Sequence, residues 1–177
     1  MGQYNIMHAQ QKQTWFNPTL MLSGLLLALG LFAADQISKN MVRDFVLENG
    51  GHVEVFPFFN LVYVWNEGVS FGMMQMDTQT GVQLLIAVAA VITALFLVIL
   101  LRAQNCFTAL ACGTIIGGSV GNIYDRVHYG AVYDFLDFHL MGHHWPAFNI
   151  ADACVVIGIA MIAYDSLFLS QKSEKKS

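Results

Sequence analysis

The stretch GVQLLIAVAAVITALFLVILL at residues 81–101 decides the fold, because it contains no charged side chain. An α-helix rises about 1.5 Å per residue, so this stretch alone reaches across the roughly 30 Å hydrocarbon core of a bilayer. Three further runs share this apolar character. We therefore expect an all-α membrane protein, a four-transmembrane-helix up-down bundle that forms a single membrane domain over residues 1–177. The four spans are predicted at about 18–36, 80–101, 106–124 and 150–170.

The composition of the chain agrees with burial in lipid. Of its 177 residues, 56% are hydrophobic and 11% are charged, under half of the charged share usual in a soluble domain. The net charge of -4 provides no basic surface, so a nucleic-acid partner is excluded. Cys106, Cys112 and Cys154 lie in or beside apolar runs and form no CxxC pair, which favours small buried side chains over a disulfide framework.

Lysine and arginine residues indicate the orientation, because they are enriched in cytoplasmic loops. Five of the eight fall at the N-terminus, in the 102–106 turn and in the C-terminal tail, and three fall on the opposite side. This bias predicts that both termini are cytoplasmic. The long connections at about 36–77 and 125–149 then lie on the outer face of the membrane. Four aspartates at the predicted span ends share that face: Asp35, Asp77, Asp125 and Asp152.

Residues 53–76 change to a pattern typical of strands, with β-branched and aromatic residues in VEVF, LVYVW and VSFGM. The segment 66–68, Asn-Glu-Gly, predicts a hairpin turn between the last two of these runs. We expect a small extracytoplasmic β-sheet resting on the membrane surface, followed later by an outer loop at 125–149. The aromatic side chains suit the headgroup zone, either as a plain anchor or as a cupped surface that receives a substrate from lipid.

Glycines in the third span match a catalytic motif by letter. Residues 117–121, GGSVG, fit the G-x-S-x-G pattern, but that motif requires a strand–turn–helix context and this copy lies inside an apolar helix. Gly113, Gly117 and Gly121 recur every four residues, which predicts close packing of this helix against a neighbour. A serine nucleophile at Ser119 is therefore not expected.

A histidine cluster follows the third span. His139, His143 and His144 lie close together, yet their spacing is not that of a zinc site and no HExxH sequence is present. Interfacial histidines beside Trp145 are the plainer interpretation. We expect no metal and no other cofactor.

Two aspartates stand in apolar surroundings. Asp134 is flanked by Tyr133 and Phe135, and Asp152 opens the fourth apolar run. Because desolvating an ionised carboxylate is expensive, each must be paired, protonated or exposed to water. Two such groups on one side of the membrane suggest a dyad that shares a proton, as in aspartic proteases. A helix-capping Asp152 with an unrelated Asp134 is an equal alternative from these residues alone.

Five sequence blocks occur in an order that resembles the bacterial lipoprotein signal peptidases, also called signal peptidase II. Each block is short, but five in order together with four spans make the resemblance specific. One small departure is Tyr124, which stands where a smaller aliphatic residue is more usual. The blocks are DQISK at 35–39, NEGVSFG at 66–72, GGSVGNIYDR at 117–126, GAVYDF at 130–135 and WPAFNIAD at 145–152.

The resemblance implies a membrane aspartic endopeptidase of the bacterial cytoplasmic membrane, with its site at the outer face and Asp134 and Asp152 as the catalytic pair. Members of this family remove signal peptides from diacylglyceryl-modified prolipoproteins, cutting just before the lipidated cysteine. The implied partners are therefore lipidated prolipoproteins, membrane lipid and inhibitors of the globomycin type. The residues implied to support the site or hold substrate are Asp35, Lys39, Asn66, Asn122, Asp125, Arg126 and Asn149.

A small four-span transporter or proton relay is the alternative function. It would also place carboxylates among membrane spans, but it predicts acidic residues spread through the membrane depth. Here the interiors of the first three spans are free of charge, and the acidic residues gather at one end. Asp165, near the cytoplasmic end of the fourth span, is the exception.

Overall fold

The computed structural model of the chain describes residues 16–68 and 78–169. In this part, four helices are long and apolar enough to cross a membrane, as the sequence predicts. They are α1 (Pro18–Glu48), α2 (Thr78–Leu101), α3 (Cys106–Tyr129) and α4 (Ile150–Tyr164), which continues as the π-helix η1 (Asp165–Leu169).

Two helices are longer than the predicted spans. The helix α1 continues past residue 36 to Glu48, and α3 continues past residue 124 to Tyr129. Each ends where glycine permits a left-handed backbone: Gly50 and Gly51 follow α1 with φ of 84° and 88°, and Gly130 caps α3 with φ of 73°. The predicted spans end where the charge-free runs end, whereas both helices continue beyond those runs.

Within the described residues, a small antiparallel sheet of four strands, in the order β1-β2-β3-β4, accompanies the helices. Its first hairpin confirms the strand prediction for 53–66, although the turn lies at 57–58 and the Asn66–Gly68 turn ends β2. The predicted strand VSFGM starts at residue 69, outside the described residues. The strands are β1 (His52–Phe56), β2 (Phe59–Asn66), β3 (Val132–Leu140) and β4 (His143–His144).

Residues 132–140, predicted as part of an outer loop, form β3 instead. This strand pairs with β2, which comes from a distant part of the chain, so that Val64 lies opposite Asp134. Most of β3 is buried, including Val132 and Phe135. Burial on both faces removes the alternation of polar and apolar residues by which an exposed strand is recognised.

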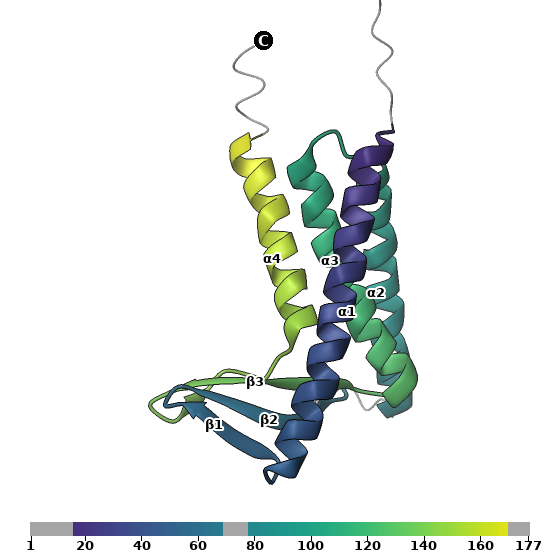
Figure 1. The fold of residues 1–177 in the computed structure, drawn as a ribbon. Coiled ribbons are helices and arrows are strands. Elements are labelled where there is room, and N and C mark those ends of the chain that lie inside the picture. Colours follow the sequence, from purple (N-terminus) through teal and green to yellow (C-terminus); the bar gives the residue numbers. More distant parts are fainter. Residues whose placement is uncertain (1–15, 69–77, 170–177) are drawn as a thin grey trace, which may run out of the picture.

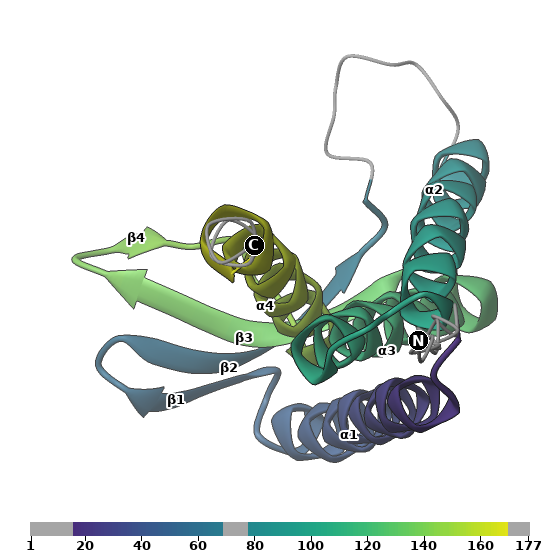
Figure 2. The same ribbon diagram turned by 90° about the horizontal axis from the view of Figure 1, so that it is seen from above.

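The helix α3 occupies the centre of the helical layer, with α1, α2 and α4 packed around it (Figure 2). Glycines allow the close approach that the sequence predicts. A Cβ atom added at Gly117 would lie 2.7 Å from the carbonyl oxygen of Ala28 on α1, and one added at Gly118 would overlap the carbonyl oxygen of Ala151 on α4. The predicted small-residue packing face is therefore confirmed.

The sheet lies across one end of the helices, and the start of α1 and the end of α4 lie at the other end (Figure 1). The outward surface of α2 is apolar, with Val91 69% exposed and Leu95 56% exposed. Such a surface is expected of a helix that faces hydrocarbon rather than water. Several buried charged and amide side chains, in contrast, gather where the sheet meets α1, α3 and α4.

Candidate active site

Three charged side chains form a buried network between α1 and α3. The Nζ atom of Lys39 lies 2.8 Å from Oδ2 of Asp35 and 2.7 Å from Oδ2 of Asp125. Asp35 is 0% exposed, Lys39 4% and Asp125 2%. Groups buried so completely must be mutually satisfied, because a lone buried charge costs several kcal/mol.

Gln36 belongs to the same network, although we did not predict it as a site residue. Its Nε2 atom donates to Oδ1 of Asp125 at 2.9 Å and to Oδ2 of Asp35 at 3.1 Å. A usable signal was present in the sequence, since Gln36 lies three residues before Lys39 on one helix face.

The start of α4 is fixed by side chains on both sides of the helix end. Asn149 and Asp152 form a capping box, in which Oδ1 of Asn149 accepts from Asp152 N at 2.9 Å and Oδ2 of Asp152 accepts from Asn149 N at 3.2 Å. Oδ1 of Asp35 accepts from Ala151 N at 3.0 Å. Asp152 is thus a capping residue, and its carboxyl group is held in one place.

Asp134 projects from β3 and is only 1% exposed. Its Oδ2 atom accepts from Asn66 Nδ2 at 2.9 Å and its Oδ1 atom from Asn149 Nδ2 at 2.7 Å. Burial, reinforced by the nearby charge of Asp152, raises the pKa of Asp134 from its ordinary value of 3.8 to about 6. The hydrogen bonds from Asn66 and Asn149 stabilise the ionised form and limit this rise in pKa.

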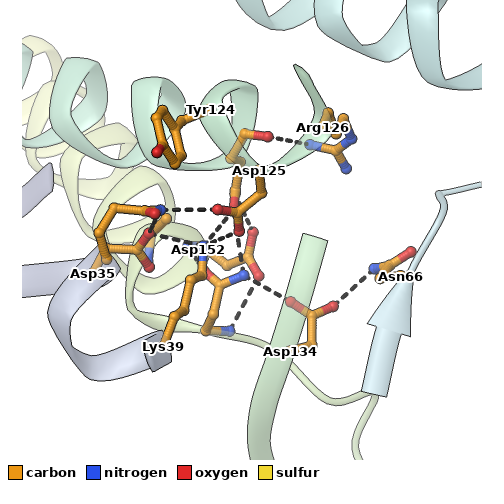
Figure 3. Close-up of polar contacts among 12 residues, drawn as sticks. Asp35, Lys39, Asn66, Tyr124, Asp125, Arg126, Asp134 and Asp152 are labelled. Carbon is orange, nitrogen blue, oxygen red and sulfur yellow. Dashed lines mark hydrogen bonds and ion pairs between the residues drawn. The ribbon is translucent and has the colours of Figure 1, made fainter. Parts of the chain in front are cut away.

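Asn149 connects the two aspartates. Its side-chain amide donates to Asp134, while its backbone N–H donates to Asp152. Asn122 supplies a further donor, from its Nδ2 atom to Oδ1 of Asp152 at 2.7 Å. The carboxyl groups of Asp134 and Asp152, carried by a strand and a helix, therefore lie within one hydrogen-bonded cluster (Figure 3), with every carboxyl oxygen accepting an N–H bond.

Arg126 lies at the edge of this cluster on α3. Its Nη1 atom donates to the carbonyl oxygen of Asn122 at 3.5 Å, and its buried Nε atom has no hydrogen-bond partner in the described part of the chain. The guanidinium interacts electrostatically with Asp152, Asp134 and Asp125. Its Nε–H group is thus a donor that no described residue accepts.

All nine predicted site residues join one network. Asn66, Asn149 and Asn122 contact the two aspartates, and Lys39 continues the network from Asn122 at 3.4 Å. Proximity alone does not give each residue a role, but it places Asp134 in the same network as the cap of α4. The nine are Asp35, Lys39, Asn66, Asn122, Asp125, Arg126, Asp134, Asn149 and Asp152.

The histidine cluster lies apart from these residues, along the β3–β4 hairpin. Nδ1 of His144 is 2.8 Å from Oδ1 of Asp137, and Asn60 Nδ2 donates to Oδ2 of Asp137 at 2.8 Å. Burial raises the pKa of Asp137, but the bonds from Asn60 and His144 outweigh it and hold that pKa below its ordinary value. Over residues 16–68 and 78–169, no group of three or more His, Cys, Asp or Glu residues is placed to hold a metal ion.

Comparison with known proteins identifies the family. Residues 27–168 match the family described as signal peptidase (SPase) II. This chain belongs to the signal peptidase II family. A lipoprotein signal peptidase of Nitrobacter hamburgensis is 41% identical over 154 residues, covering 84% of this chain and 93% of that protein. The family resemblance carried by the five sequence blocks is confirmed.

Further relatives agree with the signal peptidase II assignment. A lipoprotein signal peptidase of Anaplasma marginale is 40% identical over 137 residues, which span 77% of this chain and 79% of that protein. A solved structure described as a bacterial membrane enzyme superposes with a TM-score of 0.69 at 26% identity, covering 82% of this chain and 93% of that one. The family is therefore shared with the Anaplasma marginale protein, and the fold with the solved membrane enzyme, over most of each chain.

Proposed function

We propose that this protein is a membrane aspartic endopeptidase that removes signal peptides from diacylglyceryl-modified prolipoproteins, cutting before the lipidated cysteine. One observation carries the proposal: Asn149 donates one hydrogen bond to Asp134 and another to Asp152, which holds two carboxyl groups together in a signal peptidase II family member. Two adjacent carboxyl groups that cannot both ionise cheaply provide an acid and a base at one place.

Asp134 and Asp152 divide the chemistry between them. The more deeply buried Asp134 holds the shared proton, in keeping with its raised pKa, and the partly exposed Asp152 acts as the base. Asp152 takes a proton from a water molecule as the water oxygen bonds to the scissile carbonyl carbon, and Asp134 gives its proton to the carbonyl oxygen. The resulting diol collapses as the C–N bond breaks, the amine receives the proton from Asp152, and a diol hydroxyl returns a proton to Asp134.

The neutral and cationic donors around the pair suit an extended peptide substrate. Asn66 is exposed at the end of β2, and Arg126 has an Nε–H donor that no described residue accepts. Both can bind backbone carbonyl groups without adding negative charge beside the two carboxyl groups. Asp35, Lys39, Asp125 and Asn122 lie behind the pair and support it. Globomycin-type peptides would compete for the same position.

The substrate class is consistent with the position of the site in the fold. In this proposal the helices form an up-down bundle, with the sheet and the two aspartates at the outer face of the cytoplasmic membrane. The diacylglyceryl chains of a prolipoprotein would remain in hydrocarbon against the apolar helix surfaces, while the adjacent peptide bond reaches the polar cluster. Holding reactants in register in this way removes several kcal/mol from a barrier.

Cleavage of a lipidated precursor by the purified protein tests the proposal. Asp134→Asn and Asp152→Asn should each fold and bind but cleave at least about a thousandfold more slowly, because each removes one of the two proton carriers. Asp44→Asn is the matched control, since Asp44 lies on α1 with a side chain 65% exposed and an ion pair to Arg43. Near-normal cleavage by either dyad variant would contradict the proposal.

Inhibitors test the reaction class independently of the variants. EDTA and phenylmethylsulfonyl fluoride should leave the cleavage rate unchanged, because neither a metal ion nor a serine nucleophile takes part. Ser119→Ala should behave likewise, because Ser119 lies inside α3. A loss of activity with EDTA that zinc restores would point to the histidines instead. The transporter alternative gains no support from relatives named as lipoprotein signal peptidases.

A further inference from the structure

The side-chain amide of Asn122 lies between a cation and a proposed catalytic carboxylate. Its Oδ1 atom is 3.4 Å from Lys39 Nζ, and its Nδ2 atom donates to Oδ1 of Asp152 at 2.7 Å. Asn122 is 9% exposed and Lys39 4% exposed, so water does not take the place of either contact. The amide therefore links the charged network behind the site to the carboxyl group that faces the substrate.

Lys39 allows only one orientation of this amide. If the Asn122 amide were turned over, its NH2 group would face the Lys39 ammonium and its oxygen would face the Asp152 carboxylate. Donor would then meet donor and acceptor would meet acceptor, in a buried place where such contacts are strongly unfavourable. Without an ammonium at position 39, the donor–donor conflict disappears, only the conflict with Asp152 remains, and the amide is less firmly fixed.

The same oxygen of Asn122 also orients Asn149. Nδ2 of Asn149 donates to Oδ1 of Asn122 at 3.3 Å and to Oδ1 of Asp134 at 2.7 Å. The Asn122 oxygen thus accepts from Lys39 and Asn149 together, and the two amides direct N–H groups at both aspartates. One ammonium group consequently influences the donors to Asp152 and to Asp134.

Lys39 is held by two ion pairs while it donates to Asn122. Its Nζ atom lies 2.8 Å from Oδ2 of Asp35 and 2.7 Å from Oδ2 of Asp125, and it donates to Oδ1 of Asn122 at 3.4 Å. Asp35 and Asp125 are in turn bridged by Gln36. The ammonium therefore has three oxygen partners, an arrangement that neither the planar group of arginine nor an apolar side chain reproduces.

We propose that Lys39 is a positioning residue of the peptidase: its ammonium fixes the Asn122 amide, and through it Asn149, so that both amides donate to the catalytic carboxyl oxygens. The inference rests on the proposed function. The simpler view is that Lys39 only ties α1 to α3 as a buried ion pair. The two views differ in what a neutral hydrogen-bond donor at position 39 should do.

Two double variants of equal charge separate these views. Lys39→Gln with Asp125→Asn, and Lys39→Met with Asp125→Asn, each remove one positive and one negative buried charge, so their losses of stability are comparable. Only the glutamine variant keeps an N–H donor at the end of this side chain, where it can be directed toward Asn122. We expect it to retain kcat within about tenfold of wild type, while the methionine variant loses about a hundredfold in kcat with little change in KM.

The single variant Asn122→Asp tests the inference even if the double variants do not fold. Asn122→Asp keeps an oxygen acceptor for Lys39 but removes the N–H donor to Asp152. We expect its unfolding temperature to be preserved and its kcat to fall about a hundredfold. Wild-type kcat in this variant would overturn the inference.

Non-additivity tests whether Lys39 acts through Asn122. Asn122→Ala should lower kcat strongly in the wild-type background and only slightly in the Lys39→Met, Asp125→Asn background. Equal kcat in the glutamine and methionine variants, or strictly additive losses, would overturn the inference. Where wild type cleaves and Asp134→Asn does not, equal kcat values or additive losses would overturn only the role of Lys39. The proposed function itself fails if wild type does not cleave the lipidated precursor.

Discussion

Asp134 shows how one residue sets the pH range of the proposed reaction. Its carboxyl group is buried beside Asp152, which raises its pKa to about 6 against 3.8 when it is solvated. Between pH 3.8 and about 6, Asp134 therefore keeps its proton in the folded protein but loses it in the unfolded chain. The stability linked to this proton is fully present below the unfolded pKa and declines as the pH rises through the folded pKa.

The pH dependence of cleavage follows from the same residue. If Asp134 must be protonated, kcat/KM should fall as the pH rises through about 6, because kcat/KM reports the substrate-free enzyme. The hydrogen bond from Asn66 lowers the pKa of Asp134, so Asn66→Ala should move this fall to higher pH even if the maximal rate is reduced. Rates of cleavage measured from pH 4 to 9 test this; a shift to lower pH would contradict the role given to Asp134.

Single residues also show how far the sequence predicts the site. Asp134 and Asp152 attract attention because carboxylates in apolar surroundings are costly, and the sequence blocks implied the supporting asparagines. From the sequence alone, Asp152 could cap a helix or face Asp134; the structure shows the cap and joins Asp134 to it through Asn149. The connection depends on Asn149, which donates to both carboxyl groups. Its contact with Asp134, fifteen residues away, cannot be inferred from residue spacing.

At the scale of elements, the sequence located the apolar part of each helix but not its ends. The charge of Asp35 interrupts the first apolar run, and the sequence therefore predicts that the first span ends there. In the fold, Asp35 is satisfied by Lys39 from its own helix and by Ala151 N from α4, so α1 continues without penalty to Glu48. Partners from other elements cannot be inferred from local hydropathy, and the pairing of β2 with β3 escaped prediction for the same reason.

Helix packing gives a prediction at this scale. Gly113→Ala should destabilise the fold by about 1–3 kcal/mol, because the added methyl group would overlap the backbone of Gly24 on α1 and the two helices must separate. Gly30→Ala is the matched control, since a Cβ atom there meets nothing within 4 Å. Thermal unfolding in detergent micelles should show a lower midpoint for Gly113→Ala only; equal midpoints would mean that α1 and α3 are not packed so closely.

For the whole molecule, function requires that both chemistry and substrate meet at one face of the membrane. The sheet and the buried polar cluster lie at one end of the helices, and the α2–α3 turn lies at the other (Figure 1). Prolipoprotein signal peptides are cut where the lipidated cysteine lies, at the outer side in the proposed reaction. The lysine and arginine count, five against three, predicts that the sheet lies on that side.

Cysteine labelling from one side of the membrane tests this orientation. Cys106, exposed at the first residue of α3, should be cytoplasmic, whereas Met141, 92% exposed in the β3–β4 turn, should face outward. A membrane-impermeant maleimide added to intact spheroplasts should therefore label Met141→Cys in a Cys106→Ser background and leave Cys106 of the unaltered chain unlabelled. After lysis both should react, while the buried Cys112 and Cys154 remain protected in the folded protein. The opposite pattern in intact spheroplasts would place the sheet, and with it Asp134 and Asp152, on the side of the membrane where no lipidated precursor presents its cleavage site.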